Sequence, residues 1–182
     1  MKDSSGKMPL QSTTRDALLP GGSDADFREM LHNTLAFASR IQNVRDGFAS
    51  LLGLSGAQFT ILMAVRRLQG SDGIGVNALA EHLHLSGAFV TIEVNKLVAQ
   101  NLINKRPHPE DKRRVRLTLS EEGSLRLTSL LPVQAPVNDA LFASLTAEEF
   151  KTFHSIMKRL VQHGDEALAL LSFYMAKTGT ES

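Results

Sequence analysis

The apolar residues between positions 24 and 52 recur at steps of three and four, so they share one face of a helix. They are Phe27, Leu31, Leu35, Ala38, Ile41, Val44 and Phe48. The pattern predicts one long amphipathic helix over residues 24–52. A helix of this length is too long to be buried by one small core. A partner subunit is therefore a candidate for the surface that covers its apolar face.

Three shorter helices are predicted next. The first, over residues 55–69, opens on a capping box formed by Ser55 and Gln58 and is apolar nearly all round, which indicates a buried central helix. The second and third cover residues 77–84 and 86–100, with Ser86 as the N-cap of the third. Two helices joined by so short a turn form a helix-turn-helix.

The hydrophobic period then changes from that of a helix to that of a strand. Val115, Leu117 and Leu119 alternate with polar residues, so this strand has one buried face and one basic face. Residues 103–106 can pair with it, and residues 107–112 form the hairpin tip. A helix-turn-helix followed by a basic hairpin is a winged helix. The predicted fold is therefore mostly α with a small β-hairpin wing.

The same signals predict the segments on either side. Ser120 caps a helix that Pro132 and Pro136 kink or break. A capping box at residues 146–149 opens a last helix, which runs to about residue 176 with a bend at Gly164. Residues 1–23 are polar and predict a disordered tail with one short turn near residues 16–19. We expect a winged helix-turn-helix domain at 55–123 between helical segments at 24–54 and 124–182.

Composition narrows the possible functions. The 182 residues include no cysteine, which excludes disulfides, cysteine-based zinc sites and a thiol redox sensor. No apolar run approaches the roughly 20 residues of a membrane helix, and no apolar segment follows the N-terminus. We therefore expect a cytoplasmic protein that has no membrane partner.

Catalytic and metal-binding patterns are missing from the sequence. It contains no G-x-G-x-x-G, P-loop, G-x-S-x-G or H-E-x-x-H motif, so we expect neither an enzyme nor a cofactor. The histidine pairs His82/His84 and His154/His163 do not have the spacing of a tetrahedral ligand set. Surface histidines are the simpler interpretation, and no metal is expected.

Charge is concentrated in the predicted wing. The net charge of the chain is +1, yet the fifteen residues from Ile103 to Leu117 hold six basic and two acidic side chains. A basic patch of this density is the electrostatic footprint of a nucleic-acid-binding surface.

The wing sequence resembles that of the MarR family of bacterial regulators. Residues 101–106 read Asn-Leu-Ile-Asn-Lys-Arg, residues 109–114 read Pro-Glu-Asp-Lys-Arg-Arg, and residues 115–123 read Val-Arg-Leu-Thr-Leu-Ser-Glu-Glu-Gly. The family pattern is roughly Gly-Leu-Val-x-Arg, then Asp-x-Arg, then Leu-Thr-x-x-Gly. The spacing from Asp111 to Leu119 and Gly123 matches without a gap, and the order of elements agrees from about residue 24 to residue 176.

The resemblance implies a homodimer formed by the first and last helices, which makes residues 24–54 and 124–182 the dimerisation region. It also implies that the recognition helix enters the major groove of double-stranded DNA and that the wing enters the minor groove. An effector pocket is implied between the dimerisation region and the DNA-binding domain.

Residue roles follow from the matched motif. Arg113 corresponds to the arginine that enters the minor groove, where its guanidinium fits the enhanced negative potential, and Asp111 orients the wing. The alternative is a solvated hairpin with a surface ion pair. Further basic wing residues are candidate phosphate contacts or solvated surface. They are Lys105, Arg106, Lys112, Arg114 and Arg116.

The outer face of the predicted recognition helix is short of charge. It comprises Ser86, Gly87, Ala88, Thr91, Ile92, Asn95 and Lys96. Asn95 can read adenine, Thr91 a base edge or a phosphate, and Ala88 or Ile92 a thymine methyl group. The helix lacks arginine, whereas the family often has one at the position of Ile92, and Glu93 repels phosphate. Binding is therefore expected to rest on the wing, phosphates and DNA shape.

A set of residues is proposed for the effector pocket by its placement in the family pattern. The set is His32, Phe37, Arg40, Phe59 and Met63. An arginine beside aromatic side chains suits a small aromatic acid or its conjugate. Core packing for Phe37, Phe59 and Met63, and surface exposure for Arg40, is the alternative.

The sequence thus predicts a homodimeric repressor that binds a pseudo-palindromic operator and is released by a small-molecule effector. Its two recognition helices must sit about 34 Å apart to engage both half-sites. A winged-helix interaction module without DNA binding is the second hypothesis, motivated by the arginine-free recognition helix. A small enzyme is the third.

Overall fold

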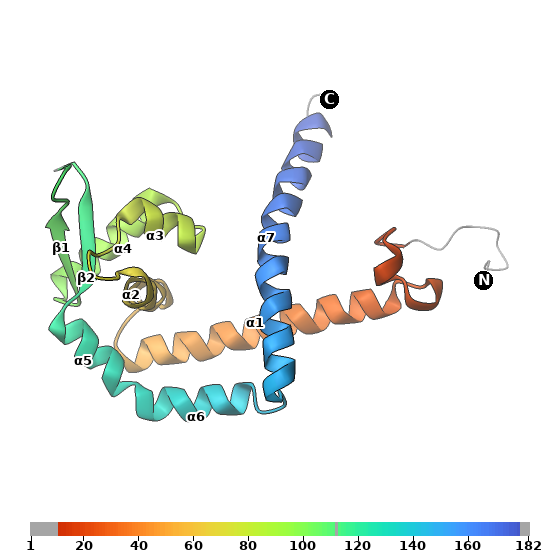
Figure 1. Cartoon of the computed structure of the whole chain (residues 1–182), viewed down its shortest axis with the longest axis horizontal. Coiled ribbons are helices and arrows are strands. Elements are labelled where there is room, and N and C mark those ends of the chain that lie inside the picture. Colours follow the sequence, from red (N-terminus) through yellow and green to blue (C-terminus); the bar gives the residue numbers. More distant parts are fainter. Residues whose placement is uncertain (1–10, 112, 179–182) are drawn as a thin grey trace. The chain divides into compact units, whose positions relative to one another are not determined.

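The computed structural model describes residues 11–111 and 113–178. The chain divides into two compact units, and the boundary falls between Ala135 and Pro136. Figure 1 labels the α-helices and the strands. In chain order the elements are η1 (Asp16–Leu18), η2 (Pro20–Gly22), α1 (Ala25–Leu51), α2 (Gly56–Leu68), α3 (Val76–Leu83), α4 (Gly87–Ala99), β1 (Ile103–Pro107), β2 (Val115–Leu119), α5 (Glu121–Ser129), α6 (Leu131–Leu141) and α7 (Ala147–Thr178). The predicted mostly helical fold with one β-hairpin is confirmed.

Helix α2 lies at the centre of the first unit, as its apolar sequence predicts. Phe59, Ile61, Leu62 and Val65 are buried, and α2 packs against α1, α3, α4 and β2. Burial of each such side chain contributes about 1.5–3 kcal/mol to the free energy of unfolding. The capping box that starts the helix is present, because Ser55 Oγ accepts from Gln58 N and Gln58 Oε1 accepts from Ser55 N.

Helices α1 and α2 meet at an angle of 89°. The rings of Phe48 and Phe59 pack edge to face with centroids 6.3 Å apart. Arg45 extends from α1 over the Phe59 ring and donates to Thr60 Oγ1 across 2.9 Å. The junction therefore combines apolar burial with a cation–π contact, and both hold α1 against α2.

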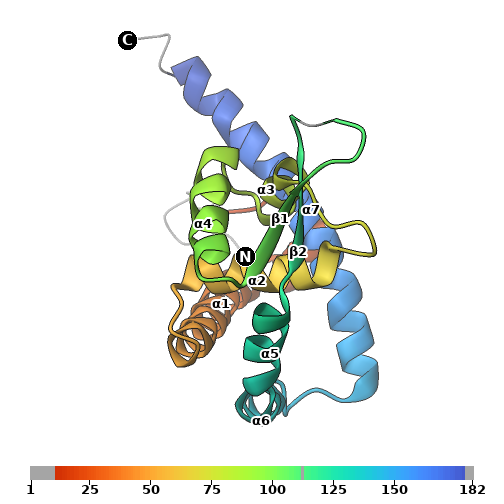
Figure 2. The same cartoon turned by 90° about the vertical axis from the view of Figure 1, so that its left-hand side faces the viewer.

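The wing is a two-stranded antiparallel hairpin in which Ile103 pairs with Leu119 and Pro107 pairs with Val115. A third segment adds to it, since Ile74 and Leu117 exchange both backbone hydrogen bonds. Gln69 Oε1, at the end of α2, accepts from Leu119 N across 2.7 Å. The strands are thereby attached to the core on the side away from the hairpin tip, and Figure 2 shows α4 beside them.

Helix α5 starts against the turn that joins α4 to β1. Ser120 caps it by accepting from Gly123 N, and the Ser120 hydroxyl also donates to the carbonyl of Asn101. Asn101 has a φ of 57°, a left-handed conformation that suits asparagine or glycine, which explains the glycine at this position of the family pattern. Gly123 faces the Leu102 carbonyl so closely that a Cβ there would overlap its oxygen.

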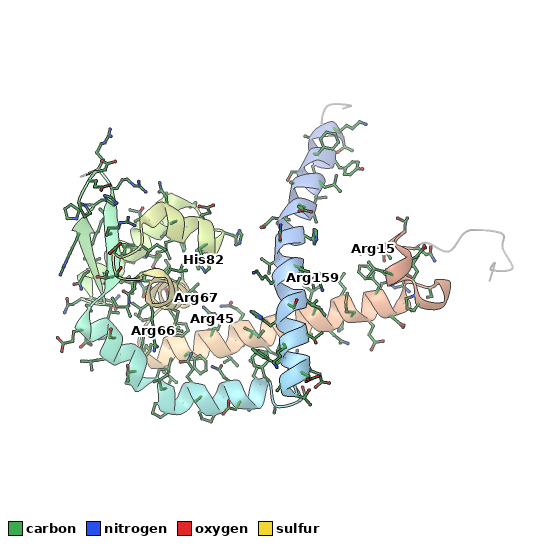
Figure 3. The ribbon with its side chains drawn as sticks, in the orientation of Figure 1. Arg15, Arg45, Arg66, Arg67, His82 and Arg159 are labelled. Carbon is green, nitrogen blue, oxygen red and sulfur yellow. The ribbon has the colours of Figure 1, made fainter. Side chains whose placement is uncertain are left out.

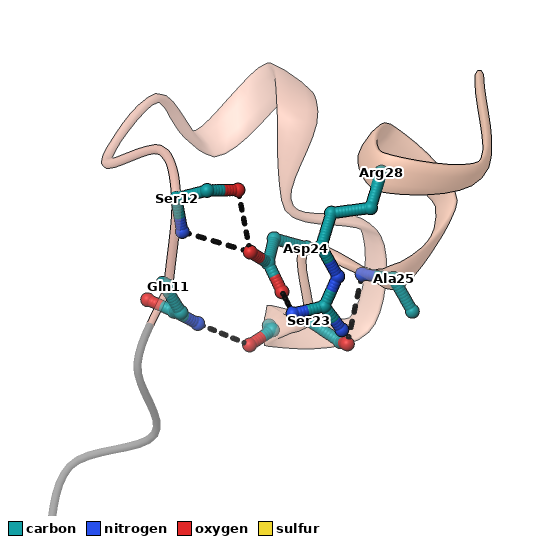
Figure 4. A network of polar contacts seen from close by, with 7 residues as sticks. Gln11, Ser12, Ser23, Asp24, Ala25 and Arg28 are labelled. Atoms are coloured by element: carbon teal, nitrogen blue, oxygen red, sulfur yellow. Dashed lines mark hydrogen bonds and ion pairs between the residues drawn. The ribbon is translucent and has the colours of Figure 1, made fainter. Parts of the chain in front are cut away.

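The segment before α1 is held by Asp24, which is buried (Figure 4). Asp24 Oδ2 accepts from the backbone N–H and the hydroxyl of Ser12 across 2.8 Å and 2.7 Å, and Arg28 pairs with Oδ1. These hydrogen bonds hold the pKa of the Asp24 carboxyl below its ordinary value, against the opposing effect of burial. The short turn expected near residues 16–19 is present as η1, whereas residues 1–10 of the expected tail lie outside the described residues.

The helices after the wing differ in part from the expectation. The helix from Ser120 ends before Leu131 and α6 begins there, with Pro132 in its first turn, where a missing N–H costs little. Pro136 lies inside α6 without ending it, and α7 continues as one helix through Gly164. The capping box at Thr146 and Glu149 is confirmed, because each residue's side chain accepts from the other's backbone N–H.

Within residues 11–111 and 113–178, no single helix has the length and apolarity needed to cross a membrane. Helices α1 and α2 meet that test together, across their sharp bend.

Gly123→Ala is expected to lower the free energy of unfolding by about 2–4 kcal/mol, because the added Cβ must displace the Leu102 backbone. Gly164→Ala is the matched control. It lies inside α7 with open space within 4 Å of the position that its methyl group would take, so it is expected to be neutral or to stabilise by up to about 1 kcal/mol. Denaturant unfolding of both variants measures this, and equal effects would contradict the packing described.

Acidification is expected to release the segment around Ser12 from α1. Because the folded pKa of Asp24 lies below its ordinary value of 3.8, its stabilising contribution is complete above that pH and is lost as the pH falls through the folded pKa. The Ser12 amide chemical shift, followed by NMR against pH, reports this step. Asp24→Asn should abolish the step and Asp26→Asn, an exposed neighbour, should keep it; an unchanged step in Asp24→Asn would refute the assignment.

Candidate nucleic-acid interface

Helix α4 is placed by a buried stripe and a capped start. Val90, Val94 and Leu97 are buried against the core, and Ser86 Oγ accepts from Phe89 N across 3.2 Å. The turn before it is made by His84, which ends α3 in a left-handed conformation with a φ of 52°. The predicted helix-turn-helix is therefore present, and the face of α4 opposite the stripe points to solvent.

The exposed side of α4 carries most of the predicted set. Ser86, Gly87, Ala88, Ile92, Asn95 and Lys96 are exposed. Thr91 is half-buried, and its hydroxyl donates to the Gly87 carbonyl across 2.7 Å. Sequence reasoning missed Phe89, which is 40% exposed beside Ile92 at 55%. Residues 89, 92 and 96 share one side of a helix, which was a partial signal, but the angle at which α4 buries its stripe decides whether Phe89 is exposed.

The charges of α4 neutralise each other. Glu93 is only 6% exposed and accepts from Lys96 Nζ across 2.7 Å. A buried carboxylate is costly without a partner, so this ion pair holds the ammonium group of Lys96 close to the helix. The repulsion between Glu93 and a DNA phosphate is therefore partly offset by Lys96. In turn, the positive charge of Lys96 is already paired with a carboxylate of its own helix.

A hydrogen bond connects α4 to the wing. Lys105 Nζ, on β1, donates to Asn95 Oδ1 across 3.0 Å. The two candidate DNA-contacting elements therefore belong to one unit with a direct polar link, and Figure 2 shows them side by side.

The hairpin tip presents Arg113. Asp111 Oδ1 accepts from the Arg113 backbone N–H across 3.0 Å and lies 3.4 Å from its Nε, while the side chain of Arg113 is 92% exposed. The Asp111 carbonyl accepts from Arg114 N, which completes a tight turn. The carboxylate thus shapes the tip and leaves the guanidinium available. Lys112 lies outside the described residues.

Arg116 has a different environment from the other basic wing residues. It donates through Nη1 to the Gly73 carbonyl and through Nη2 to His108 Nε2, across 3.3 Å and 2.9 Å. It therefore joins the α2–α3 loop to the wing, which makes it a structural residue. Lys105, Arg106 and Arg114 are exposed.

Near the end of α2, two exposed cations were not among the residues proposed from the sequence. Arg66 and Arg67 end α2, where their charge suits the negative end of the helix dipole (Figure 3). Their position follows from the fold, since no motif marks them in the sequence.

The residues proposed for an effector lie on α1 and α2. Phe59 is 1% exposed in the core, and Met63 and Phe37 are half-buried. His32 and Arg40 are exposed, and Arg40 Nη1 donates to the Ala36 carbonyl of its own helix. The packing of Phe59 on Phe48 gives it a structural role, and the effector site stays a prediction. Among the described residues, no three His, Asp or Glu side chains are grouped for a metal ion.

The family match and a curated relative both point to transcriptional regulators. A family model described as "MarR family" matches residues 52–114. The HTH-type transcriptional repressor YetL of Bacillus subtilis is 24% identical over 139 residues, which cover 76% of this chain and 83% of the relative.

Two solved structures share the fold. A cysteine-to-serine mutant of E. coli MarR complexed with operator DNA has a TM-score of 0.61 and 22% identity, covering 75% of this chain and 94% of that one. The PcaV transcriptional regulator of Streptomyces coelicolor, in complex with its natural ligand, has a TM-score of 0.55 and 24% identity, covering 69% and 89%. Residues 52–114 of this chain therefore match the MarR family model, and the chain shares its winged-helix fold with MarR-family transcriptional regulators.

Proposed function

We propose that the chain is a homodimeric, DNA-binding repressor that a small molecule releases from its operator. The observation that carries the proposal is the geometry of the first unit. A solvent-facing recognition helix and a hairpin tip with an exposed arginine belong to one packed body, linked by the hydrogen bond from Lys105 to Asn95. This arrangement can engage adjacent grooves of one duplex.

The wing supplies most of the electrostatic attraction. Lys105, Arg106, Arg113 and Arg114 are exposed along the hairpin, where each phosphate contact adds affinity and salt dependence. Arg113 at the tip suits a narrow minor groove, whose negative potential favours a guanidinium. Arg116 and Lys96 have partners within the chain, so we assign them smaller contributions to DNA binding.

A second copy of the chain is the proposed cover for the exposed apolar side chains of the two long helices. On α1 these are Met30, Leu31, Leu35 and Leu51. On α7 they are Phe150, Phe153, Ile156, Leu160, Val161, Leu168, Leu170, Leu171, Phe173, Tyr174 and Met175. Apolar surface of this extent is rare on monomers. A two-fold dimer also presents two recognition helices to a pseudo-palindromic site.

Repression and release by a ligand are supported by the relatives. YetL is named a repressor, and PcaV was solved with its natural ligand. A ligand that binds better to a dimer with the wrong spacing of recognition helices weakens DNA binding through that difference in affinity. The alternative of an interaction module without DNA binding is favoured by one observation, the exposed Phe89 and Ile92 on α4.

Arg113→Ala is expected to weaken binding to the duplex upstream of the coding sequence by about 10- to 100-fold at low salt, on a scale of roughly 1–3 kcal/mol. The thermal midpoint should not change, because the side chain is exposed. Fluorescence anisotropy at two salt concentrations measures the affinity, and the titration should saturate at two chains per duplex.

Two variants of equal charge change serve as controls. Arg15→Ala, before η1, should leave both affinity and stability unchanged. Arg116→Ala should lower the free energy of unfolding by about 1–2 kcal/mol, because the Gly73 carbonyl loses its charged donor. Absence of salt-sensitive binding by the unmodified protein, to this duplex and to pooled genomic fragments, would refute the proposal and favour the interaction module.

A further inference from the structure

We propose that α4 recognises its DNA site mainly through thymine methyl groups, with Phe89 and Ile92 as the specificity-determining residues. The recognition face is defined here as the exposed side chains of Ala88, Phe89, Ile92, Asn95 and Lys96. The inference rests on the proposed DNA-binding function and names the bases that the function requires.

The polar atoms of this face already have partners within the chain. Lys96 is paired with the buried Glu93, and the Thr91 hydroxyl donates to the Gly87 carbonyl behind the face. The Asn95 carboxamide must turn its oxygen toward Lys105, because an ammonium group can only donate. These contacts reduce the groups of α4 that are left for hydrogen-bond readout to the N–H groups of Asn95, the second lone pair of its oxygen and the two remaining N–H groups of Lys96.

The contact with Lys105 leaves Asn95 only part of its capacity to read a base. A bidentate contact with adenine needs the carboxamide oxygen to accept from N6 while its nitrogen donates to N7. The bond from Lys105 occupies one of the two lone pairs of the oxygen and limits its orientation. Donation by the nitrogen alone to N7 does not separate adenine from guanine, because both present N7. In this geometry Asn95 positions the helix over a purine, and its reading of adenine stays a prediction that needs the second lone pair to face N6.

The apolar part of the face remains for discrimination. Phe89 and Ile92 are three residues apart on one side of α4, with Ala88 next to them. In the major groove, thymine alone among the four bases presents a methyl group, and apolar side chains contact it favourably. Cytosine presents its N4 donor there, which these side chains would desolvate without offering an acceptor.

Charge complementarity argues for DNA as the occupant of this apolar face. The face adjoins the basic hairpin, and Lys105 belongs to both surfaces through its contact with Asn95. The exposed cations of the wing can hold phosphates while Phe89 and Ile92 meet the base edges beside them.

The test uses duplexes selected by the full chain from a randomised pool, followed by replacement of thymine with deoxyuridine in the recovered site. This replacement removes the methyl group and keeps the hydrogen-bonding pattern of the base. We expect recovered half-sites to share thymines, and affinity to fall about fourfold for each contacted methyl group, the equivalent of about 0.8 kcal/mol. Placing 5-methylcytosine at a thymine-to-cytosine change should restore part of the lost affinity.

The variant Phe89→Ala/Ile92→Ala should bind thymine and uracil duplexes equally, with the salt dependence of the wing retained. Leu125→Ala, an exposed apolar residue on α5, should keep the preference for thymine, as should the conservative Ile92→Leu. Equal binding of the two duplexes by the unmodified protein, or a preference that survives in the double variant, would overturn this inference alone. Recovery of no duplex at all would overturn the proposed function as well.

Discussion

The burial of α2 is the constraint on which the winged-helix unit depends. Helices α1, α3 and α4 and strand β2 all pack against α2, whose side chains fill the space between them. Gln69, which follows the last residue of this helix, accepts a hydrogen bond from the backbone N–H of Leu119 in β2. Neither the recognition helix nor the wing has a core of its own, so their relative position is set by what each buries on α2.

In this arrangement, α4 and the hairpin each have some side chains that pack within the unit and others that face solvent, where DNA would bind. On α4, one side contributes Val90, Val94 and Leu97 to the core, and the opposite side is free for a ligand. On the hairpin, Arg116 turns inward to Gly73 and His108 while Arg113 remains in solvent. These two basic residues, three positions apart, therefore have different surroundings, which their charge alone does not reveal.

The local pattern of the sequence was enough to predict the elements and the family. Periodicity locates α1 to α4 and the hairpin, and the caps at Ser55, Ser86, Ser120 and Thr146 mark where helices begin, because capping depends on near neighbours. The helix that Ser120 caps does end before Pro132, as expected of the two prolines, whereas Pro136 lies within α6 without ending it.

The partners of long polar side chains were beyond prediction. The Lys105–Asn95 and Arg116–Gly73 contacts join residues that are 10 and 43 positions apart, and they exist because β1 and β2 pack where they do. The exposure of Phe89 depends on how α4 is rotated about its axis when its apolar stripe packs against the core. The helical period of the sequence predicts that rotation only to within about one residue position. These tertiary details distinguish a face that reads bases by hydrogen bonds from one that reads them by shape and apolar contact.

The central claim is that α4 and the wing of one unit occupy the major and minor grooves of the same half-site. Interference footprinting tests it directly, with uracil in place of thymine and methylated guanine N7 as probes of the major groove and methylated adenine N3 as the probe of the minor groove. We expect interference at thymine methyl groups or guanine N7 within each half-site and at adenine N3 beside it, repeated about one helical turn away by the second copy. Interference confined to one groove, or at positions in no fixed relation between the grooves, would contradict it.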